Sequence, residues 1–207
     1  MKKVLAILMM LALIPMAYSA NPDKALKKAK EKERKEVIKR FKNEGWQLLG
    51  SSHSLEVELL EHWNKADQPG FHEESGVSTR SKSKAVGQQM SMNQAFLNYA
   101  QQGEQTIKGM IATEMNGSGI DTDTELDSFY AAYKRELENA IKGEMQKSFT
   151  IYRDNGDGTF EVQTFFIVDE KNEANARRRA FDRALQESEA AQKHAQKISE
   201  MVDKNGK

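Results

Sequence analysis

The sequence predicts an α+β fold in which long helices cover a small, mainly antiparallel sheet of three to four strands. The first observation behind this prediction is a strong β-hairpin pattern between Lys147 and Asp169. The second is that stretches with apolar residues at helical spacing lie on both sides of that hairpin. Because an isolated hairpin is only marginally stable in water, we expect the flanking helices to cover it.

The hairpin has two arms, Ser148–Arg153 and Thr159–Val168, joined by the turn-forming residues DNGDG. Asn-Gly and Asp-Gly are typical hairpin dipeptides. One face of the second arm carries Phe160, Val162, Thr164, Phe166 and Val168. The other face is also partly apolar, because it carries Phe165 and Ile167. We therefore expect the second arm to be a central strand, or else a strand whose outer face contacts a partner.

Two further stretches read as strands. The short apolar run Gly45–Gly50 lies between glycines and predicts a strand near Trp46. The segment Glu74–Lys84 alternates around Val77 and ends in spaced basic residues, which is typical of an exposed edge strand. With the hairpin strands near Ile151 and Phe165, this makes four predicted strands.

Helical patterns account for most of the remaining chain. They predict helices over Asp23–Asn43, Leu55–Lys65, Val86–Met115, Leu126–Lys142 and Asn172–Asp203. We expect the third and fourth of these, together with Asn172–Leu185, to cover one face of the sheet. The apolar stripe after Gln186 is rich in alanine and buries little area, so the C-terminal helix is expected to project in part or to pair with another helix.

The first 20 residues have the layout of a secretory signal peptide, with a basic start and small residues at the end. The apolar run Val4–Met16 is shorter than the about 20 residues that span a membrane. Cleavage is expected after Ser19 or after Ala20, and a retained N-terminal anchor is the less favoured alternative. The predicted location is therefore the periplasm or the outside of the cell.

The chain divides by composition into a signal peptide (1–20), a basic N-terminal helix (21–43), an α+β domain (44–185) and a C-terminal helical extension (186–207). Lys and Arg number 31, as do Asp and Glu, but ten of the basic residues fall between Lys24 and Lys42. This helix could contact an anionic membrane surface. A hydrated helix that docks near Val37–Phe41 is the favoured interpretation, because charged helix faces are usually only solvated. No nucleic-acid partner is expected.

No cysteine is present, which excludes a lipidated cysteine, disulfides, thiol catalysis and thiolate metal sites. The hairpin tip is no calcium loop. Aligning Gly158 with the invariant glycine of an EF-hand places Arg153 and Thr164 where Asp and Glu are required.

The histidines form no H-x-x-x-H pair of the kind that binds zinc. His62, His72 and Glu73–Glu74 would share a zinc site only if the intervening loop folds back. Ordinary surface histidines are the favoured interpretation, so we expect no metal and no cofactor.

No catalytic constellation is recognisable. Gly117–Gly119 lacks the G-x-S-x-G pattern of a nucleophile elbow, and neither a phosphate-binding loop nor a dinucleotide fingerprint occurs. Five aromatic residues could line a ligand or peptide groove, although a role in the core is favoured. They are Trp46, Trp63, Phe71, Tyr130 and Tyr133.

Two groups of residues carry a resemblance to a known family, which covers Lys84–Asp169. They are Asn93, Ala95, Asn98 and Ala100 in the long helix, and Gly156–Val162 with Phe165–Val168 in the hairpin. The chain resembles the bacterial membrane-associated (surface) lipoproteins and the related amino-terminal domain of flagellar-assembly protein T. The resemblance implies helices on a small antiparallel sheet, a place in the cell envelope and no enzyme activity. The family's lipid-anchor cysteine is absent here.

These observations predict an exported, non-catalytic envelope protein that binds a protein partner or an envelope surface. Self-association through the C-terminal helix, over Gln186–Val202, and peripheral envelope contact through the basic helix are further expectations. The alternative is an envelope hydrolase or small-ligand binder with a site near His62 and His72 or in an aromatic cleft.

Overall fold

The computed structural model describes residues 22–115, 122–194 and 199, and it has the predicted α+β class. The chain divides into two compact units, Met1–Arg40 and Phe41–Lys207. Helix α1 (Pro22–Asn43) confirms the predicted N-terminal helix, and most of its described side chains are exposed. The predicted signal peptide lies outside the described residues. No helix in the described part of the chain is long and apolar enough to span a membrane.

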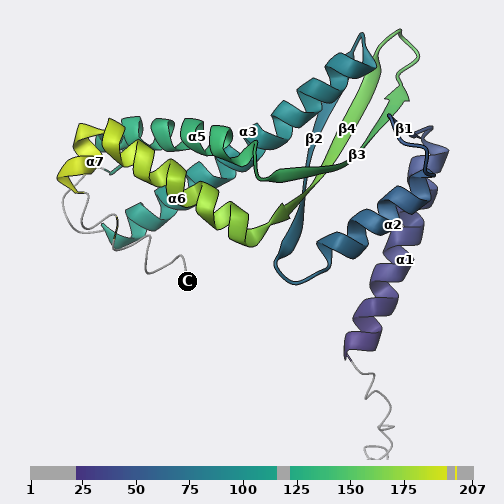
Figure 1. Ribbon diagram of the computed structural model, residues 1–207, viewed down its shortest axis with the longest axis horizontal. Helices are drawn as coiled ribbons and strands as arrows, with labels where there is room; N and C mark the ends of the chain where they lie inside the picture. The colour runs from purple at the N-terminus through teal and green to yellow at the C-terminus, as the bar shows by residue number, and fades with distance from the viewer. Residues whose placement is uncertain (1–21, 116–121, 195–198, 200–207) are drawn as a thin grey trace, which may run out of the picture. The chain divides into compact units, whose positions relative to one another are not determined.

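The second unit contains a four-stranded antiparallel sheet in the order β1-β3-β4-β2 (Figure 1). The strands are β1 (Gln47–Leu48), β2 (Phe71–Ser81), β3 (Met145–Asp154) and β4 (Phe160–Asp169). All four predicted strands are therefore confirmed. The predictions that the second hairpin arm is central and that the Val77 strand lies at an edge are also confirmed.

The hairpin tip closes through local hydrogen bonds. Asn155 N–H donates to the carbonyl oxygen of Thr159 at 3.0 Å, and Asp154 Oδ1 accepts from Gly156 N–H at 2.8 Å. Gly156 and Gly158 have φ angles of 78° and 79°, in the left-handed region that glycine adopts without a steric penalty. The DNGDG segment thus forms a turn between the strands, as predicted.

Helix α3 (Lys84–Glu114) covers one face of the sheet with its first half (Figure 1). Contact is closest at Gly76, where an added Cβ atom would lie 2.1 Å from the carbonyl oxygen of Ser91. Phe96 of α3 packs against Phe166 of β4, with ring centroids 5.4 Å apart. Glycine at position 76 is therefore required for the helix to approach the strand this closely.

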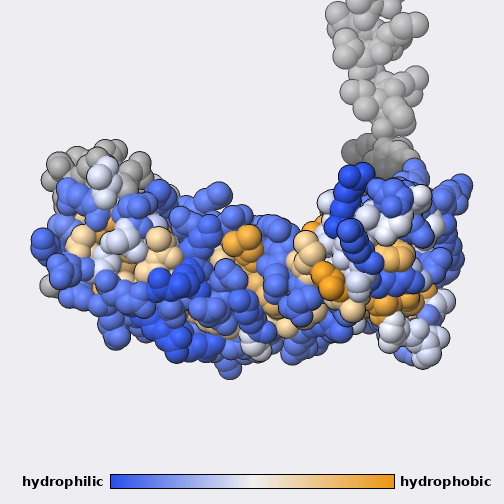
Figure 2. Space-filling model, turned by 90° about the horizontal axis from the view of Figure 1, so that it is seen from above, coloured by the Kyte–Doolittle hydropathy of each residue, from blue (hydrophilic) through white to orange (hydrophobic). Residues whose placement is uncertain are grey.

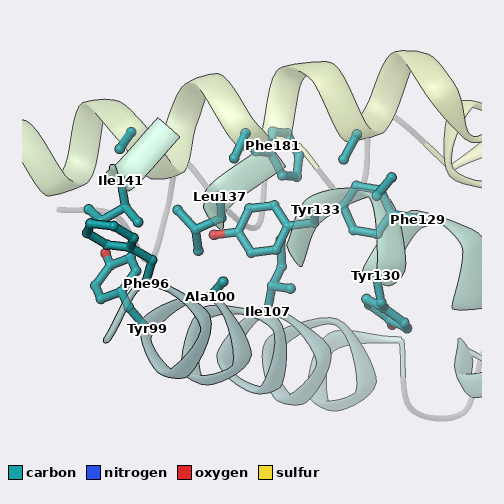
Figure 3. Close-up of a cluster of buried hydrophobic side chains, with 14 of the residues drawn as sticks. Phe96, Tyr99, Ala100, Ile107, Phe129, Tyr130, Tyr133, Leu137, Ile141 and Phe181 are labelled. Carbon is teal, nitrogen blue, oxygen red and sulfur yellow. The ribbon is translucent and has the colours of Figure 1, made fainter. Parts of the chain in front are cut away.

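The second half of α3 leaves the sheet and packs with α5 (Asp127–Ile141), and α5 packs in turn with α6 (Glu170–Glu187). Figure 3 shows the apolar core among these helices, which includes Phe129, Leu137 and Phe181. A short helix, α4 (Thr122–Glu125), precedes α5.

The prediction that three helices cover one sheet face is therefore wrong for α5 and α6. Helix α5 ends just before β3 begins, and α6 starts directly after Asp169, the last residue of β4, which caps the helix by accepting from Lys171 N–H at 2.9 Å. Because both connections are this short, the two helices lie beyond the end of the sheet and pack mainly against each other, and α5 also packs against α3.

Helix α2 (Leu55–Ala66) covers the opposite face of the sheet. Its buried residues are Leu59 and His62, and the His62 ring contacts Phe149 and Phe165. This packing explains why the outer face of the second hairpin arm is apolar.

The predicted C-terminal helix is interrupted at Ser188, whose hydroxyl caps α7 (Glu189–Lys193) by accepting from Ala191 N–H at 3.2 Å. Ser188 and Ala191 are 2% and 0% exposed, and Ala191 belongs to the helical core. Residues 188–191 therefore pack against the other helices, which is the second of the two predicted possibilities, and do not project. Except for residue 199, the predicted extension beyond residue 194 lies outside the described residues.

Candidate functional site

Two clusters of ionisable side chains lie on opposite faces of β2. Successive strand residues point to alternate faces, so His72 and Glu74 share one face while Glu73 points to the other. His72, Glu73 and Glu74 pair with Val168, Ile167 and Phe166 of β4, respectively. Glu73 therefore lies on the α2 side of the sheet, and His72 and Glu74 lie on the α3 side.

On the α2 side, His62 and Glu73 form a close pair. His62 Nε2 lies 2.6 Å from Glu73 Oε2, and the imidazole is fully buried although the carboxylate is partly exposed. The ring meets Phe149 and Phe165 edge-on, with centroid distances of 5.4 and 5.7 Å. His62 Nδ1 is buried and has no hydrogen-bond partner among the described residues.

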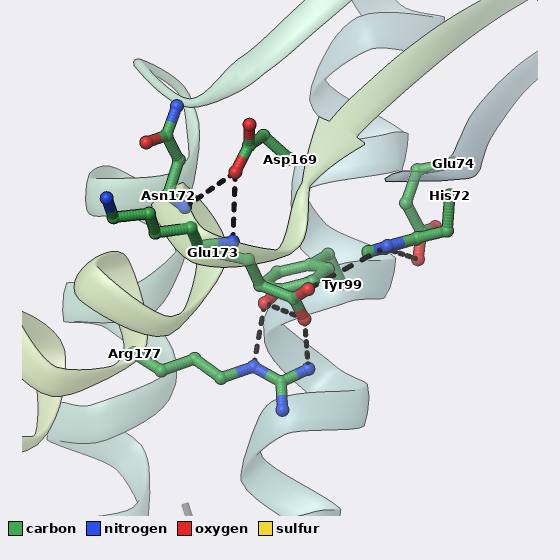
Figure 4. Close-up of polar contacts among 8 residues, drawn as sticks. His72, Glu74, Tyr99, Asp169, Asn172, Glu173 and Arg177 are labelled. Carbon is green, nitrogen blue, oxygen red and sulfur yellow. Dashed lines mark hydrogen bonds and ion pairs between the residues drawn. The ribbon is translucent and has the colours of Figure 1, made fainter. Parts of the chain in front are cut away.

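On the α3 side, Tyr99, Glu173 and Arg177 form a network with His72 and Glu74 (Figure 4). The Tyr99 hydroxyl donates to Glu173 Oε1 at 2.7 Å and accepts from Arg177 Nε at 2.8 Å. Arg177 also pairs with Glu173 at 2.5 Å. His72 lies between two carboxylates, 3.9 Å from Glu74 and 3.8 Å from Glu173.

Burial raises the pKa of two groups in this network, Tyr99 and Glu74. It raises the pKa of Tyr99 well above its usual range, and the hydrogen bond to Glu173 acts in the same direction. Burial likewise raises the pKa of Tyr133 to about 12. It also raises the pKa of the Glu74 carboxyl, against the opposing charge of His72. Tyr99 is therefore a neutral phenol at physiological pH, where it acts as a hydrogen-bond donor.

The loop after α2 folds back toward β2, as a shared histidine site requires. However, His62 and His72 face opposite sides of the sheet, so the less favoured alternative of a single site that contains both is wrong. The interpretation of His62 as a surface residue is also wrong, because the side chain is buried under the sheet. The sequence does not reveal this burial, since the covering Phe149 and Phe165 lie on a distant hairpin.

Sequence reasoning missed a third cluster, formed by His53, Glu58 and Glu61 at the start of α2. Their potential ligand atoms all lie within 4.8 Å of one another, and His53 Nδ1 is 3.4 Å from Glu58 Oε1. The spacing of the two glutamates along one helix was the available signal. His53 and Glu61 are exposed, and exposed acidic groups commonly occur without a bound metal.

The aromatic residues proposed for a groove are separated in the structure. Tyr130 and Tyr133 lie in the helical core, where they are 1% and 4% exposed (Figure 3). Trp46 is buried beside Phe41 and under the Arg153 guanidinium, whose centre lies 4.9 Å from the ring. The core interpretation is thus confirmed for these three residues. The alternative interpretation, in which they line one groove, is wrong.

A search of protein-family models, a search of curated proteins and a search of solved structures each found no match to this chain.

Proposed function

We propose that this chain is an exported, non-catalytic protein of the cell envelope that binds a protein partner or an envelope surface. One observation carries the proposal: the ionisable residues of the two β2 clusters are engaged with one another. Glu173 accepts from Tyr99 and pairs with Arg177, while His62 is buried against Glu73. Catalysis requires a base or nucleophile that faces a substrate, and these groups are held in internal pairs.

The N-terminal pattern supports the export part of this proposal. The exposed basic side chains of α1 support contact with an anionic envelope surface. On the face shown in Figure 2, the described residues are mostly hydrophilic, and hydrophobic residues appear as small separate patches. Recognition on this face would therefore rely on polar groups and on local apolar contacts.

Expression of the full chain in a bacterial host tests the export step. Mass spectrometry of the periplasmic or extracellular product should give a mature N-terminus at Ala20 or Asn21. Retention of the intact chain in the cytoplasm would contradict export.

Crosslinking of the full chain in intact cells, followed by isolation of the envelope fraction, tests the binding step. We expect a defined crosslinked species or sedimentation with envelope membranes. Hydrolysis of an ester, peptide or glycan substrate at enzyme-like rates by the purified protein would contradict the non-catalytic assignment.

The alternative proposal is a small-ligand binder or hydrolase centred on His72 alone. It is favoured by the half-exposed imidazole, which lies within 4 Å of both Glu74 and Glu173. Metal analysis of protein purified without chelator separates the two proposals. Stoichiometric zinc that is lost in a His72→Ala variant would support the alternative.

A further inference from the structure

Strand β2 has a row of backbone groups that no other strand in the described residues uses. In an antiparallel pair, alternate residues direct their N–H and C=O groups toward the partner, and the residues between them direct these groups away. Glu170 N–H donates to the carbonyl oxygen of Gly70 at 2.9 Å, which sets this alternation for β2 and β4. Glu73, Ser75 and Val77 therefore direct their N–H and C=O groups away from β4. Within the described part of the chain, no hydrogen bond uses these groups.

This open stretch has defined ends. Phe71 N–H, which also points away from β4, already donates to the carbonyl oxygen of Gln68 at 3.2 Å. At the other end, the pairing register shifts between Ser78 and Ser81, and the carbonyl oxygen of Thr79 accepts from Asn155 Nδ2 at 3.0 Å. The available edge is therefore Glu73–Val77, and it contains no proline.

Apolar side chains flank this edge on both faces of the sheet. Val77 lies on the α2 face and is 37% exposed. Met90 of α3 lies on the other face, with its sulfur 3.8 Å from Ser78 Oγ, and is 50% exposed. A strand added here would thus meet an apolar neighbour on each face at the Val77 end.

The opposite end of the open stretch is acidic. Glu73 and Glu74 point to different faces, and the Glu73 side chain remains 38% exposed although it pairs with His62. A strand that ran antiparallel to β2 would bring its C-terminal residues beside these carboxylates. Lys or Arg at those positions would complement the charge.

We propose that the Glu73–Val77 edge binds an extended segment of a partner protein, antiparallel to β2, with apolar residues followed by Lys or Arg. Only an extended backbone presents donors and acceptors at the repeat required by Glu73, Ser75 and Val77. This inference rests on the proposed function as a partner-binding protein, and it names where and how the partner is recognised.

The probe is an acetylated and amidated heptapeptide, TVVTVKK, which places valine opposite Val77 and lysines opposite Glu73 and Glu74. The control peptide has the same side chains but carries N-methyl groups on the third, fifth and seventh amides, which would face β2. Titration of the mature protein, followed by NMR, should show binding of the first peptide only. Hydrogen exchange of the Ser75 and Val77 amides should slow in the complex.

A matched pair of variants tests the edge from the protein side. Ser75→Pro removes an N–H group that points away from β4, so the β2–β4 ladder keeps its hydrogen bonds. Ser75→Ala retains that N–H group and is the control. We expect Ser75→Ala to bind the peptide like the wild type and Ser75→Pro to bind at least about tenfold more weakly. The N-methylated peptide keeps the test valid if Ser75→Pro fails to fold.

Equal binding of both peptides, protection away from β2, or no binding at millimolar peptide would overturn the proposal. So would a dimer in sedimentation that Ser75→Pro abolishes and Ser75→Ala preserves, because the occupant would then be a second copy of the chain. Crosslinks in intact cells that are the same for wild type and Ser75→Pro would keep the proposed function and reject this edge. Peptide binding without any cellular crosslink or envelope association would instead contradict the proposed function.

Discussion

The hydroxyl oxygens of Ser91 and Thr164 lie 2.6 Å apart between α3 and β4, where both side chains are fully buried. Thr150 continues this chain of hydroxyl groups, with its Oγ1 3.2 Å from that of Thr164, and it accepts from Gln88 Nε2 at 3.0 Å. Buried hydroxyl groups must find partners, so these contacts favour one alignment of the helix on the sheet.

Thr164→Val should destabilise the protein by about 1–3 kcal/mol, because it leaves the Ser91 and Thr150 hydroxyls without their shared partner. Urea denaturation measures the change. The double variant with Ser91→Ala should cost less than the sum of the two single variants. Thr79→Val, at an exposed position of the same sheet, is the control and should stay within about 0.5 kcal/mol of wild type. Strict additivity would contradict the hydrogen-bonded pair.

Gly76→Ala should also destabilise the protein, by about 1–3 kcal/mol, because the new methyl group would collide with the α3 backbone. The control is Gly109→Ala in the exposed part of α3, where no atom of the described residues lies within 4 Å of the added carbon. That variant should stabilise the helix by about 0.5–1 kcal/mol. Thermal unfolding of the two variants should shift in opposite directions, and a neutral Gly76→Ala would refute the close approach.

Tyr99→Phe should cost about 1–2 kcal/mol, because it removes hydrogen bonds to both Glu173 and Arg177. Tyr133→Phe is a matched control in the same helical core, since the Tyr133 hydroxyl makes no hydrogen bond among the described residues. Chemical denaturation should therefore separate the two variants. Similar losses of stability would show that the Tyr99 network contributes little.

Glu74→Gln should change how stability depends on pH. Burial raises the folded-state pKa of Glu74 above its ordinary value of 4.5, so the folded protein binds this proton more tightly than the unfolded chain. That contribution to stability is fully present below pH 4.5 and is lost as the pH rises through the folded-state pKa. Glu74→Gln should hence be more stable than wild type at pH 7, and the difference should shrink below pH 4.5.

Urea denaturation at several pH values between 4 and 7 measures this difference. Glu31→Gln, at an exposed position in α1, should show no comparable pH dependence. A Glu74→Gln variant that is less stable than wild type at pH 7 would mean that the pairing with His72 outweighs burial.

Local patterns were sufficient for the strands and for most of the helices. The alternation in Thr159–Val168 predicted a central strand, because a strand with apolar residues on both faces needs cover on both faces. That cover is α3 on one side and α2 on the other. The interruption of the last helix at Ser188 was missed, because serine is also tolerated within helices and gives no clear signal to stop.

The polar networks were less predictable. Tyr99 and Arg177 are 78 residues apart, and His62 contacts a hairpin that begins more than 80 residues later. Such pairings depend on how elements stack, and no periodicity within either element encodes them. The open edge of β2 was predicted only in part. The sequence predicted an edge strand, but the identity of its three outward-facing residues follows from the register with β4.

By itself, the sequence determined the α+β class, the hairpin and the central place of its second arm, since these depend on local periodicity and turn residues. Only the tertiary structure decided that His62 and His72 face opposite sides of the sheet and that α5 and α6 pack beyond its end. It also decided that no strand of the described residues pairs with the outer edge of Glu73–Val77. The physical reason is that short connections and strand register bring distant residues together, and both are properties of the assembled sheet and helices.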